Sequence, residues 1–555
     1  MRAPGPKKAS RAKARRGPAP SSLALGSPAP AFSIFPRPGW PRERVHRRLL
    51  FRLGRVYQWG EVALDRLVSS ALNPLYHTGT IAMFSLAVAL VTGIYLFLFY
   101  RVGTDAAHRS IEGIMAQPLG IGALMRSLHR YSSDAAILAA ALHGLKMFLN
   151  DRFWGARWIG WVSGLALLSL VWVTGATGYW LVWDKQAQVL SLVTAKFLDV
   201  LPVFGEPLVR TFLDASRIQN FLFFLILFIH ITIPLLLGAA YWLHVMRLSR
   251  ARFMPPRVVL WVTAAALLIA SVLRPALSGP PADLGRLPGV IPIDWFYFFY
   301  FPLTRLDPLW AWGMLAIAGL LVLSVPWALR GPAPARAKVE NPACTGCTRC
   351  WKDCPFEAII MVPRDDGTRY KQLAVVNPAK CVGCGICVGA CDSAGILLGD
   401  QPVSLLGQAV TARLRSVAAA SGRQPVLVYA CRLMQPLAGR LGPDGSLEGL
   451  PGVTVMGLPC VGTLHPDMIT KSLAAGAEGI FVAGCVPEDC PYREGSRWLA
   501  ERLTGQRLPS LKQVPEGRLR VRWYSPVEVG RFVRDTRLFQ EELSREAPLP
   551  EEARP

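Results

Sequence analysis

Six apolar stretches constrain this chain more than any other feature, because each is near the ~20 residues that a helix needs to cross a ~30 Å hydrocarbon layer. Only 18% of the 555 residues are charged and 52% are hydrophobic, which excludes a mainly disordered chain. We therefore expect an all-α membrane bundle of about six transmembrane helices. The stretches are 80–100, 134–149 with its flank from 127, 158–183, 218–245, 258–273 and 309–329.

Charge sets the expected orientation of these helices. The net charge of +24 fits basic cytoplasmic loops better than a nucleic-acid partner, given the apolar excess. Residues 246–257 hold four arginines and no acid, whereas 184–217 hold four basic and four acidic residues. The positive-inside rule predicts a multi-pass protein of the cytoplasmic membrane with both termini in the cytoplasm. Residues 1–45 are predicted to be a disordered basic tail, and 47–70 a helix that either lies on the membrane surface or packs in the ordinary way.

Four of the eight histidines fall in these spans, in two pairs of equal spacing. His129 and His143 are fourteen residues apart, and so are His230 and His244. Fourteen residues at ~100° each return to nearly the same helix face after ~21 Å of rise, so two such helices can hold two stacked metal centres. A lone membrane histidine often bonds only a neighbouring helix. Two matched pairs instead predict two b haems, His129 with His230 near the outer face and His143 with His244 near the cytoplasmic face.

Glycines repeat this spacing in or beside two other spans. Gly79 and Gly93 are fourteen residues apart, and so are Gly164 and Gly178. A glycine leaves room for a flat macrocycle against the helix backbone, which favours a role for all four beside the haems. The alternative is close packing of two helices through small residues.

Three segments resemble the cytochrome b family of bc-type complexes: RSLHRYSSDAAILAAALHGLKMF (126–148), VTGATGYWLVWD (173–184) and LPVFGEPLVRTFLDAS (201–216). The resemblance covers about residues 50–329, and it implies that Arg126 and Lys146 face haem propionates. The segment PIDWFY (292–297) is similar to the family's Pro-Glu-Trp-Tyr motif. It implies that Asp294 accepts a proton at an outer quinol site.

Eight of the twelve cysteines form a doubled pattern after the last span. Each run has the spacing Cys-x2-Cys-x2-Cys-x3-Cys of bacterial two-cluster ferredoxins, in which the fourth cysteine of each run ligates the other cluster. This full pattern predicts two [4Fe–4S] clusters rather than structural zinc. The expected ligands are Cys344, Cys347, Cys350 and Cys391 for cluster one, and Cys381, Cys384, Cys387 and Cys354 for cluster two.

The last four cysteines accompany apolar runs that are typical of buried parallel strands, at 425–431, 452–460 and 479–485, with a helix at 467–476. In such α/β folds, sites gather at the carboxyl ends of the strands. Buried inert thiols or a zinc site are the alternatives. The stretch 458–496 resembles the delta subunit of methyl-viologen-reducing hydrogenase, which implies a [2Fe–2S] centre. Its ligands would be Cys431, Cys460, Cys485 and Cys490.

The sequence therefore predicts a membrane bundle followed by a ferredoxin-like α+β domain and a small α/β domain. The expected segments are a tail (1–45), a cytochrome b-like transmembrane domain (46–329), a linker (330–340), a two-cluster ferredoxin domain (341–400), a delta-subunit-like domain (401–535) and a C-terminal tail (536–555). In chain order, the expected redox centres form an electron-transfer chain that runs from the outer haem to the inner haem, the two cubanes and the [2Fe–2S] centre.

This order of redox centres predicts a quinone-linked oxidoreductase subunit that exchanges electrons between the quinone pool and a cytoplasmic partner. Two alternatives stay open: an electron-conducting subunit without its own quinone site, and the core of a proton-motive bc-type complex. The first would leave the aromatic run 295–301 as a mere interface anchor, and the second requires an outer acceptor outside this chain. Expected partners are the membrane, quinone or quinol, a cytoplasmic flavoprotein of heterodisulfide-reductase type, an outer-face electron acceptor subunit and a second copy of the chain, but no nucleic acid.

Overall fold

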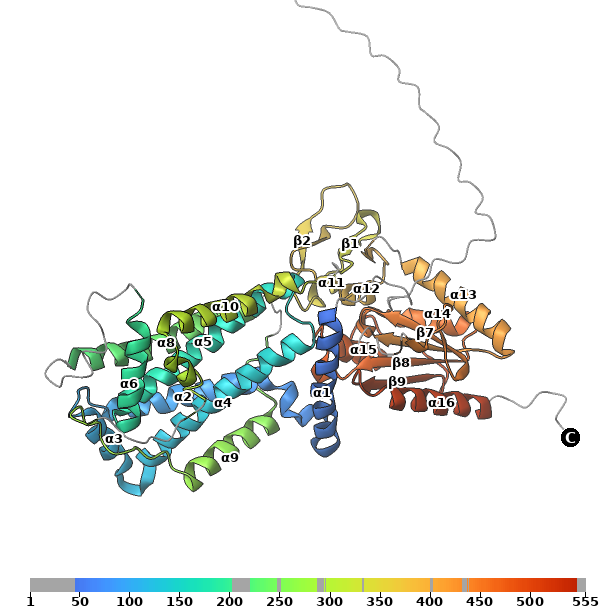
Figure 1. Ribbon diagram of the computed structural model, residues 1–555. Helices are drawn as coiled ribbons and strands as arrows, with labels where there is room; N and C mark the ends of the chain where they lie inside the picture. The colour runs from blue at the N-terminus through green and yellow to red at the C-terminus, as the bar shows by residue number, and fades with distance from the viewer. Residues whose placement is uncertain are drawn as a thin grey trace, which may run out of the picture.

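A helical bundle and a sheet domain lie at opposite ends of the molecule, with a small cysteine-rich domain beside their junction (Figure 1). The structure is a computed structural model. The expected basic tail and almost all of the matched segment 201–216 lie outside the residues that it describes. The described residues are 45–201, 220–246, 251–286, 294, 296–331, 334–399, 403–431, 437 and 439–546.

The bundle is built mainly from two pairs of packed helices. Helix α2 packs along α4 and α5 packs along α8, while α9 lies against α4 (Figure 1). Every predicted apolar stretch corresponds to one of these helices or to α10. The helices are α1 (Val45–Val68), α2 (Thr78–Phe99), α3 (Ala107–Met115), α4 (Ile121–Leu149), α5 (Trp158–Val182), α6 (Lys185–Leu198), α8 (Asn220–Val245), α9 (Arg257–Leu273) and α10 (Pro308–Ala328).

Four of the described helices are long and apolar enough to cross a membrane: Thr78–Phe99, Gly155–Val182, Leu222–Val245 and Pro308–Ala328. Helix α9 has only 17 residues, and the 29-residue α4 carries charged side chains such as Arg130 and Asp134. Large apolar side chains of α10, such as Trp310, are exposed, as expected for a surface that faces lipid. The helical membrane bundle is confirmed, whereas length and composition support four of the six expected spans.

Helix α1 stands at the junction between the bundle and the sheet domain (Figure 1). It packs against α4 and buries Glu61 and Val62. The helix also exposes large apolar side chains such as Val56, Trp59 and Leu67, so packing against α4 and a position on the membrane surface both stay open.

The cysteine-rich domain consists of two small antiparallel sheets around tight loops. Strand β1 (Ala337–Val339) pairs with β4 (Ile396–Leu398), and β2 (Ile359–Pro363) pairs with β3 (Gln372–Val376). Short helices α11 (Arg349–Lys352) and α12 (Ile386–Gly389) follow the cysteine loops. Strand β1 lies in the segment that we expected to be a linker (330–340). Its pairing with β4 makes this part of the segment belong to the cysteine-rich domain.

The sheet domain has five strands in the order β6-β7-β5-β8-β9, and β7, β5, β8 and β9 run parallel. The strands are β5 (Val426–Cys431), β6 (Ser446–Leu447), β7 (Leu450–Leu458), β8 (Gly479–Cys485) and β9 (Leu519–Tyr524). Helices cover both faces, since α13 (Val403–Ser421), α14 (Pro466–Ala474) and α15 (Gly495–Leu503) share one core and α16 (Val529–Glu546) the other. The three predicted strands are confirmed.

The end of the chain differs from the expectation. We predicted a tail from residue 536, but α16 continues to Glu546 and buries Phe539 and Leu543 against the sheet. The buried apolar residues of this polar helix, such as Phe532, Phe539 and Leu543, form a narrow stripe in a charged sequence.

Candidate functional site: two histidine pairs and three cysteine groups

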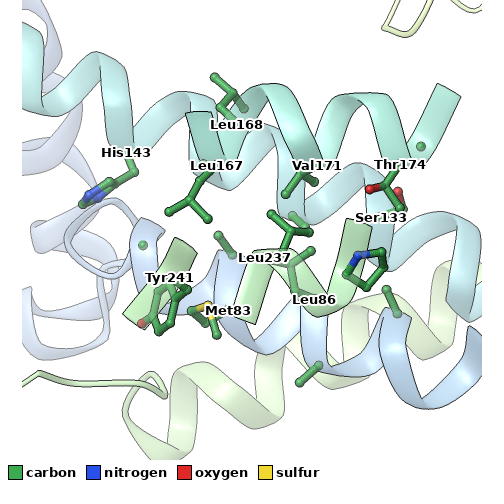
Figure 2. Close-up of a pocket in the computed structure, with 18 of the residues that line it drawn as sticks. Met83, Leu86, Ser133, His143, Leu167, Leu168, Val171, Thr174, Leu237 and Tyr241 are labelled. Carbon is green, nitrogen blue, oxygen red and sulfur yellow. The ribbon is translucent and has the colours of Figure 1, made fainter. Parts of the chain in front are cut away.

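A cavity of about 1190 Å³ runs through the bundle and is lined by α2, α4, α5 and α8. All four predicted histidines line it. Apolar side chains such as Met83, Leu167 and Leu237 separate the two histidine levels, as Figure 2 shows around His143. Such a space suits a large, mostly apolar group that is held by few polar contacts.

The two histidines of the first level face each other across this cavity. The ring centres of His129 and His230 are 6.3 Å apart. Two metal–nitrogen bonds of about 2 Å, plus about 1 Å from each ring nitrogen to its ring centre, span roughly 6 Å. The pair is therefore spaced to hold one metal ion between its rings.

Hydrogen bonds fix which ring nitrogen is free to bind. Nδ1 of His129 lies 2.9 Å from the carbonyl oxygen of Ala89, and Nδ1 of His230 lies 3.0 Å from that of Thr174. A carbonyl can only accept, so both rings donate from Nδ1 and keep the lone pair on Nε2. Ser163 donates to the Ile159 carbonyl and lies 2.9 Å from Nδ1 of His244, which orients this ring in the same way. A metal-binding histidine needs this kind of support.

Each of the four predicted glycines lies directly behind one histidine ring on the neighbouring helix. A Cβ atom there would lie 2.9–3.2 Å from the ring, closer than the ~3.5–4 Å of ordinary carbon contact. We expected the glycines to leave room for a macrocycle, but the nearest atoms that they accommodate belong to the imidazoles. The distances are 3.1 Å from Gly79 to His143, 2.9 Å from Gly93 to His129, 3.2 Å from Gly164 to His244 and 3.1 Å from Gly178 to His230.

The two cations that we expected near propionates have different surroundings. Arg126 is buried and lines the cavity, and its Nη1 has no hydrogen-bond partner within the described part of the chain. This guanidinium can therefore take an anionic group. Lys146 differs from the expectation, because its ammonium pairs with Glu61 at 2.6 Å and with Asp489 at 3.0 Å.

Asp294 lies in a polar cluster at the other end of the cavity. Arg130 donates to its carboxylate at 2.5 Å, and the Tyr179 hydroxyl also donates to it. The same carboxylate accepts a hydrogen bond from the Phe296 amide at 3.0 Å, so it caps the turn into the aromatic run as well. Sequence reasoning missed Arg130 and Tyr179, although Arg130 directly follows His129.

The doubled cysteine pattern forms two groups in space. One small pocket is lined by Cys344, Cys347, Cys350 and Cys391. Burial, followed by the neighbouring Cys391, Cys347 and Cys344, raises the pKa of Cys350 to about 12. Burial, Cys384, Cys354 and Cys381 raise the pKa of Cys387. The fourth cysteine of each run thus lies with the first three of the other run.

The last four cysteines also come together, at the carboxyl ends of β5, β7 and β8. Hydrogen bonds from Cys460 and Cys485 hold the pKa of Cys490 below its ordinary value, and a hydrogen bond links Cys485 to Cys431. A Cβ atom on Gly495 would lie 2.1 Å from the Cys460 sulfur, so this glycine makes room for the thiol group. Nearby, His465 caps α14, since its Nδ1 accepts from the Asp467 amide.

Among the residues that the structure describes, no three histidine, cysteine or acidic side chains converge closely enough to hold a single metal ion. Iron–sulfur clusters need a wider cage, because each thiolate binds a different part of the cluster.

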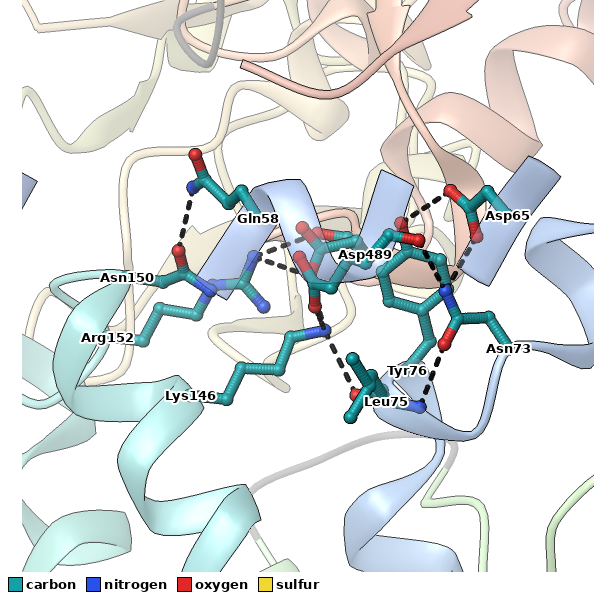
Figure 3. A network of polar contacts seen from close by, with 10 residues as sticks. Gln58, Asp65, Asn73, Leu75, Tyr76, Lys146, Asn150, Arg152 and Asp489 are labelled. Carbon is teal, nitrogen blue, oxygen red and sulfur yellow. Dashed lines mark hydrogen bonds and ion pairs between the residues drawn. The ribbon is translucent and has the colours of Figure 1, made fainter. Parts of the chain in front are cut away.

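A buried ionic cluster joins the bundle to the sheet domain (Figure 3). Asp489 accepts from Arg152 at 3.0 Å and from Lys146 at 3.0 Å, and Lys146 also pairs with Glu61. Burial and the nearby Asp489 raise the pKa of Glu61 to about 7. Against its burial, Arg152 and Lys146 hold the pKa of Asp489 below the usual range. No sequence pattern could have found this cluster, because its members are up to 428 residues apart.

Taken together, the bundle, the facing histidines and the grouped cysteines define a multi-pass membrane electron-transfer subunit. Comparison with known proteins makes this more specific. Residues 63–252 match the family model Cytochrome b/b6/petB, residues 343–396 match the 4Fe-4S dicluster domain, and residues 426–545 match the delta subunit of methyl-viologen-reducing hydrogenase. The expected fusion of these three segments is confirmed.

A solved chain described as "Hyperthermophilic respiratory Complex III" is also similar to this one. It is 18% identical, with a TM-score of 0.35, over 51% of this chain and 81% of that chain.

Proposed function

We propose that this chain conducts electrons between the quinone pool and a cytoplasmic redox partner, through two b haems and three iron–sulfur centres. The observation that carries the proposal is the arrangement of the four histidines: each ring is backed by a glycine, and the first pair is 6.3 Å apart across the cavity. In His129 and His230 the Nδ1 atom donates a hydrogen bond to a backbone carbonyl, so Nε2 is available to bind iron.

In this proposal His129 and His230 hold the outer haem, and His143 and His244 hold the inner haem. Haem iron supplies reversible one-electron chemistry. The chain's own residues orient the ligands through Ala89, Thr174 and Ser163, and exclude water with an apolar lining. Arg126 is the residue placed to neutralise a propionate, and we withdraw Lys146 from that role because carboxylates occupy its ammonium.

The cysteines are proposed to hold two [4Fe–4S] clusters and one [2Fe–2S] cluster. The pocket of Cys344, Cys347, Cys350 and Cys391 supports the crossed ligation of cluster one. The mutual proximity of Cys354, Cys381, Cys384 and Cys387 supports cluster two. The grouping of the last four thiols at strand ends supports a third centre over inert thiols, and the cluster type rests on the similarity to the delta subunit.

The quinone site is proposed at the outer end, beside Asp294. Within the aromatic run, Tyr297 and Phe298 are almost completely buried, and the Tyr297 hydroxyl lies 3.0 Å from the Ser133 hydroxyl. Phe296 and Phe299 of the same run are exposed, as interface anchors would be, but Tyr297 lines the cavity, which supports a quinone pocket over the wiring-only alternative. The Asp294 carboxylate can accept a proton by exchanging its contact with Arg130 or Tyr179.

The partners are proposed from the same arrangement. The chain lies in the cytoplasmic membrane with its iron–sulfur domains in the cytoplasm, where a flavoprotein of heterodisulfide-reductase type would exchange electrons with them. An outer-face acceptor and a second copy of the chain are the remaining proposed partners, and an outer acceptor would make the chain the core of a bc-type complex.

The purified full-length chain tests the proposal by its cofactor content. We expect two b haems per polypeptide in a pyridine haemochrome assay and about ten non-haem irons, four for each cubane and two for the third centre. Fewer than two haems would refute the histidine pairing, and about eight irons would return the last four cysteines to inert thiols. Reduction of both haems by a quinol analogue is then the test of the quinone site.

A further inference from the structure

The loop that carries Cys490 in the sheet domain contacts the inner end of the bundle. Arg152 donates to both the backbone carbonyl of Asp489, at 2.8 Å, and its carboxylate, at 3.0 Å. On the other side of the cysteine, Arg157 donates to the carbonyl of Pro491 at 2.6 Å. Cys490 is therefore held between two arginines of the loop that connects α4 to α5.

The bundle contributes cations to this contact and the loop contributes acceptors. Lys146 and Arg252 add to the arginines, and Glu494, which lies 3.8 Å from Arg252, adds to Asp489. The side chains of Lys146, Arg152 and Asp489 are mostly buried, so water screens their pairs little, whereas Arg252 is half exposed. Charge-assisted hydrogen bonds of this kind fix geometry as well as adding energy.

The contact places Cys490 next to the inner histidine pair. Lys146 lies three residues after His143 and thus on the same face of α4. Among the twelve cysteines, all of which lie in the described part of the chain, Cys490 is the one that lines the cavity with His143 and His244. Phe356, Lys380 and Val382 of the cysteine-rich domain reach the same end of the cavity, but their neighbouring cysteines do not line it.

The cysteine-rich domain also contacts the sheet domain close to the same four-cysteine group. Thr463 donates to the Cys384 carbonyl at 3.0 Å, and Arg502 pairs with Asp353 at 2.6 Å. Cys384 belongs to the same buried cluster as Cys460, Cys485 and Cys490. Cluster two therefore adjoins the four-cysteine group, whereas Cys490 is the cysteine that lines the cavity, which differs from the order that the sequence suggests.

We infer that Asp489 is a positioning residue that holds the four-cysteine centre against the inner end of the bundle, and that this centre, rather than a cubane, exchanges electrons directly with the inner haem. The inference rests on the proposed function, since it requires both centres to be present. In each step one electron leaves one centre and enters the other, and no proton or ligand needs to move between them. The cubanes then follow, cluster two before cluster one.

The test uses the full-length chain in detergent, with wild type compared to Asp489→Asn, Asp489→Glu and Arg152→Lys. An oxidised low-spin haem speeds the spin relaxation of a paramagnetic centre close to it. We expect this enhancement on the signal of the reduced four-cysteine centre in wild type, its loss in Asp489→Asn, and its retention in the two variants that keep the charges. Hydrogen exchange of residues 486–494 should rise in parallel in Asp489→Asn.

The matched control is Glu542→Gln, which removes the carboxylate with which Glu542 of α16 pairs with Arg520 of β9. This variant should change neither the spin-relaxation enhancement nor the hydrogen exchange of residues 486–494. If the enhancement falls on a cubane signal in wild type, or survives in Asp489→Asn with unchanged exchange, the inference is wrong. A wild-type chain without two haems or without the third centre refutes the proposed function instead, so the two failures are distinguishable.

Discussion

Replacing Gly93 by alanine should selectively disturb the outer haem. The new Cβ would lie 2.9 Å from Cε1 of His129, whereas carbon atoms rest about 3.5–4 Å apart, so the ring must retreat by roughly 0.6–1 Å. A free imidazole would turn aside at little cost, but a ring that is bound to iron and hydrogen-bonded to Ala89 cannot. The penalty should therefore appear mainly in the haem-loaded protein.

The magnitude follows from two opposing effects. Alanine in place of glycine favours a helix by about 1 kcal/mol, while overpacking costs about 1–3 kcal/mol. Gly319→Ala in α10 is the matched control, because a Cβ there meets nothing within 4 Å and the residue does not line the cavity, so only the favourable effect remains. Haem content and the redox titration of each haem measure the outcome. Equal behaviour of the two variants, or a shift confined to the inner haem, would refute the assignment of Gly93 to the outer histidine.

Three further predictions address other parts of the chain. His143→Ala should remove the inner haem but leave the outer haem reducible by quinol, as optical redox titration will show; loss of both haems would mean that the two sites do not form independently. Asp294→Asn should slow quinol-driven haem reduction at unchanged haem content while Asp294→Glu retains most activity, and unchanged stopped-flow rates in Asp294→Asn would exclude this carboxylate. Glu61→Gln should flatten the pH dependence of thermal stability between about pH 4.5 and 7. Burial raises the pKa of Glu61 to about 7, so the folded wild-type chain binds a proton that the unfolded chain has lost in this range. The wild type therefore loses stability as pH rises through this range, and the variant does not. Identical melting profiles from pH 5 to 8 would contradict the assignment.

The parts of the site that sequence predicts are those set by local periodicity. The fourteen-residue spacing of His129 and His143 is a property of one helix, and the structure brings the pair to one cavity with His230 and His244. The crossed grouping of Cys391 with the first cysteine run likewise follows from spacing within a compact domain.

The parts that sequence did not predict depend on long-range contacts. Arg152 and Asp489 are 337 positions apart, and each alone resembles an ordinary surface charge. Strand β9 alternates arginine with apolar residues, which obscured a strand that is parallel to β8. Chain order was also a poor guide to spatial order, because the Cys490 loop, which holds the last cysteine of the chain, lines the same cavity as the inner histidines.

The basic end of the bundle also constrains how the protein is made. Lys146, Arg152 and Glu61 emerge from the ribosome long before Asp489, so these buried charges stay hydrated until nearly the whole chain has been synthesised. Docking then pairs the loop on either side of Cys490 with Arg152 and Arg157. Closure of the junction therefore follows synthesis of the sheet domain, which makes it one of the last steps in folding.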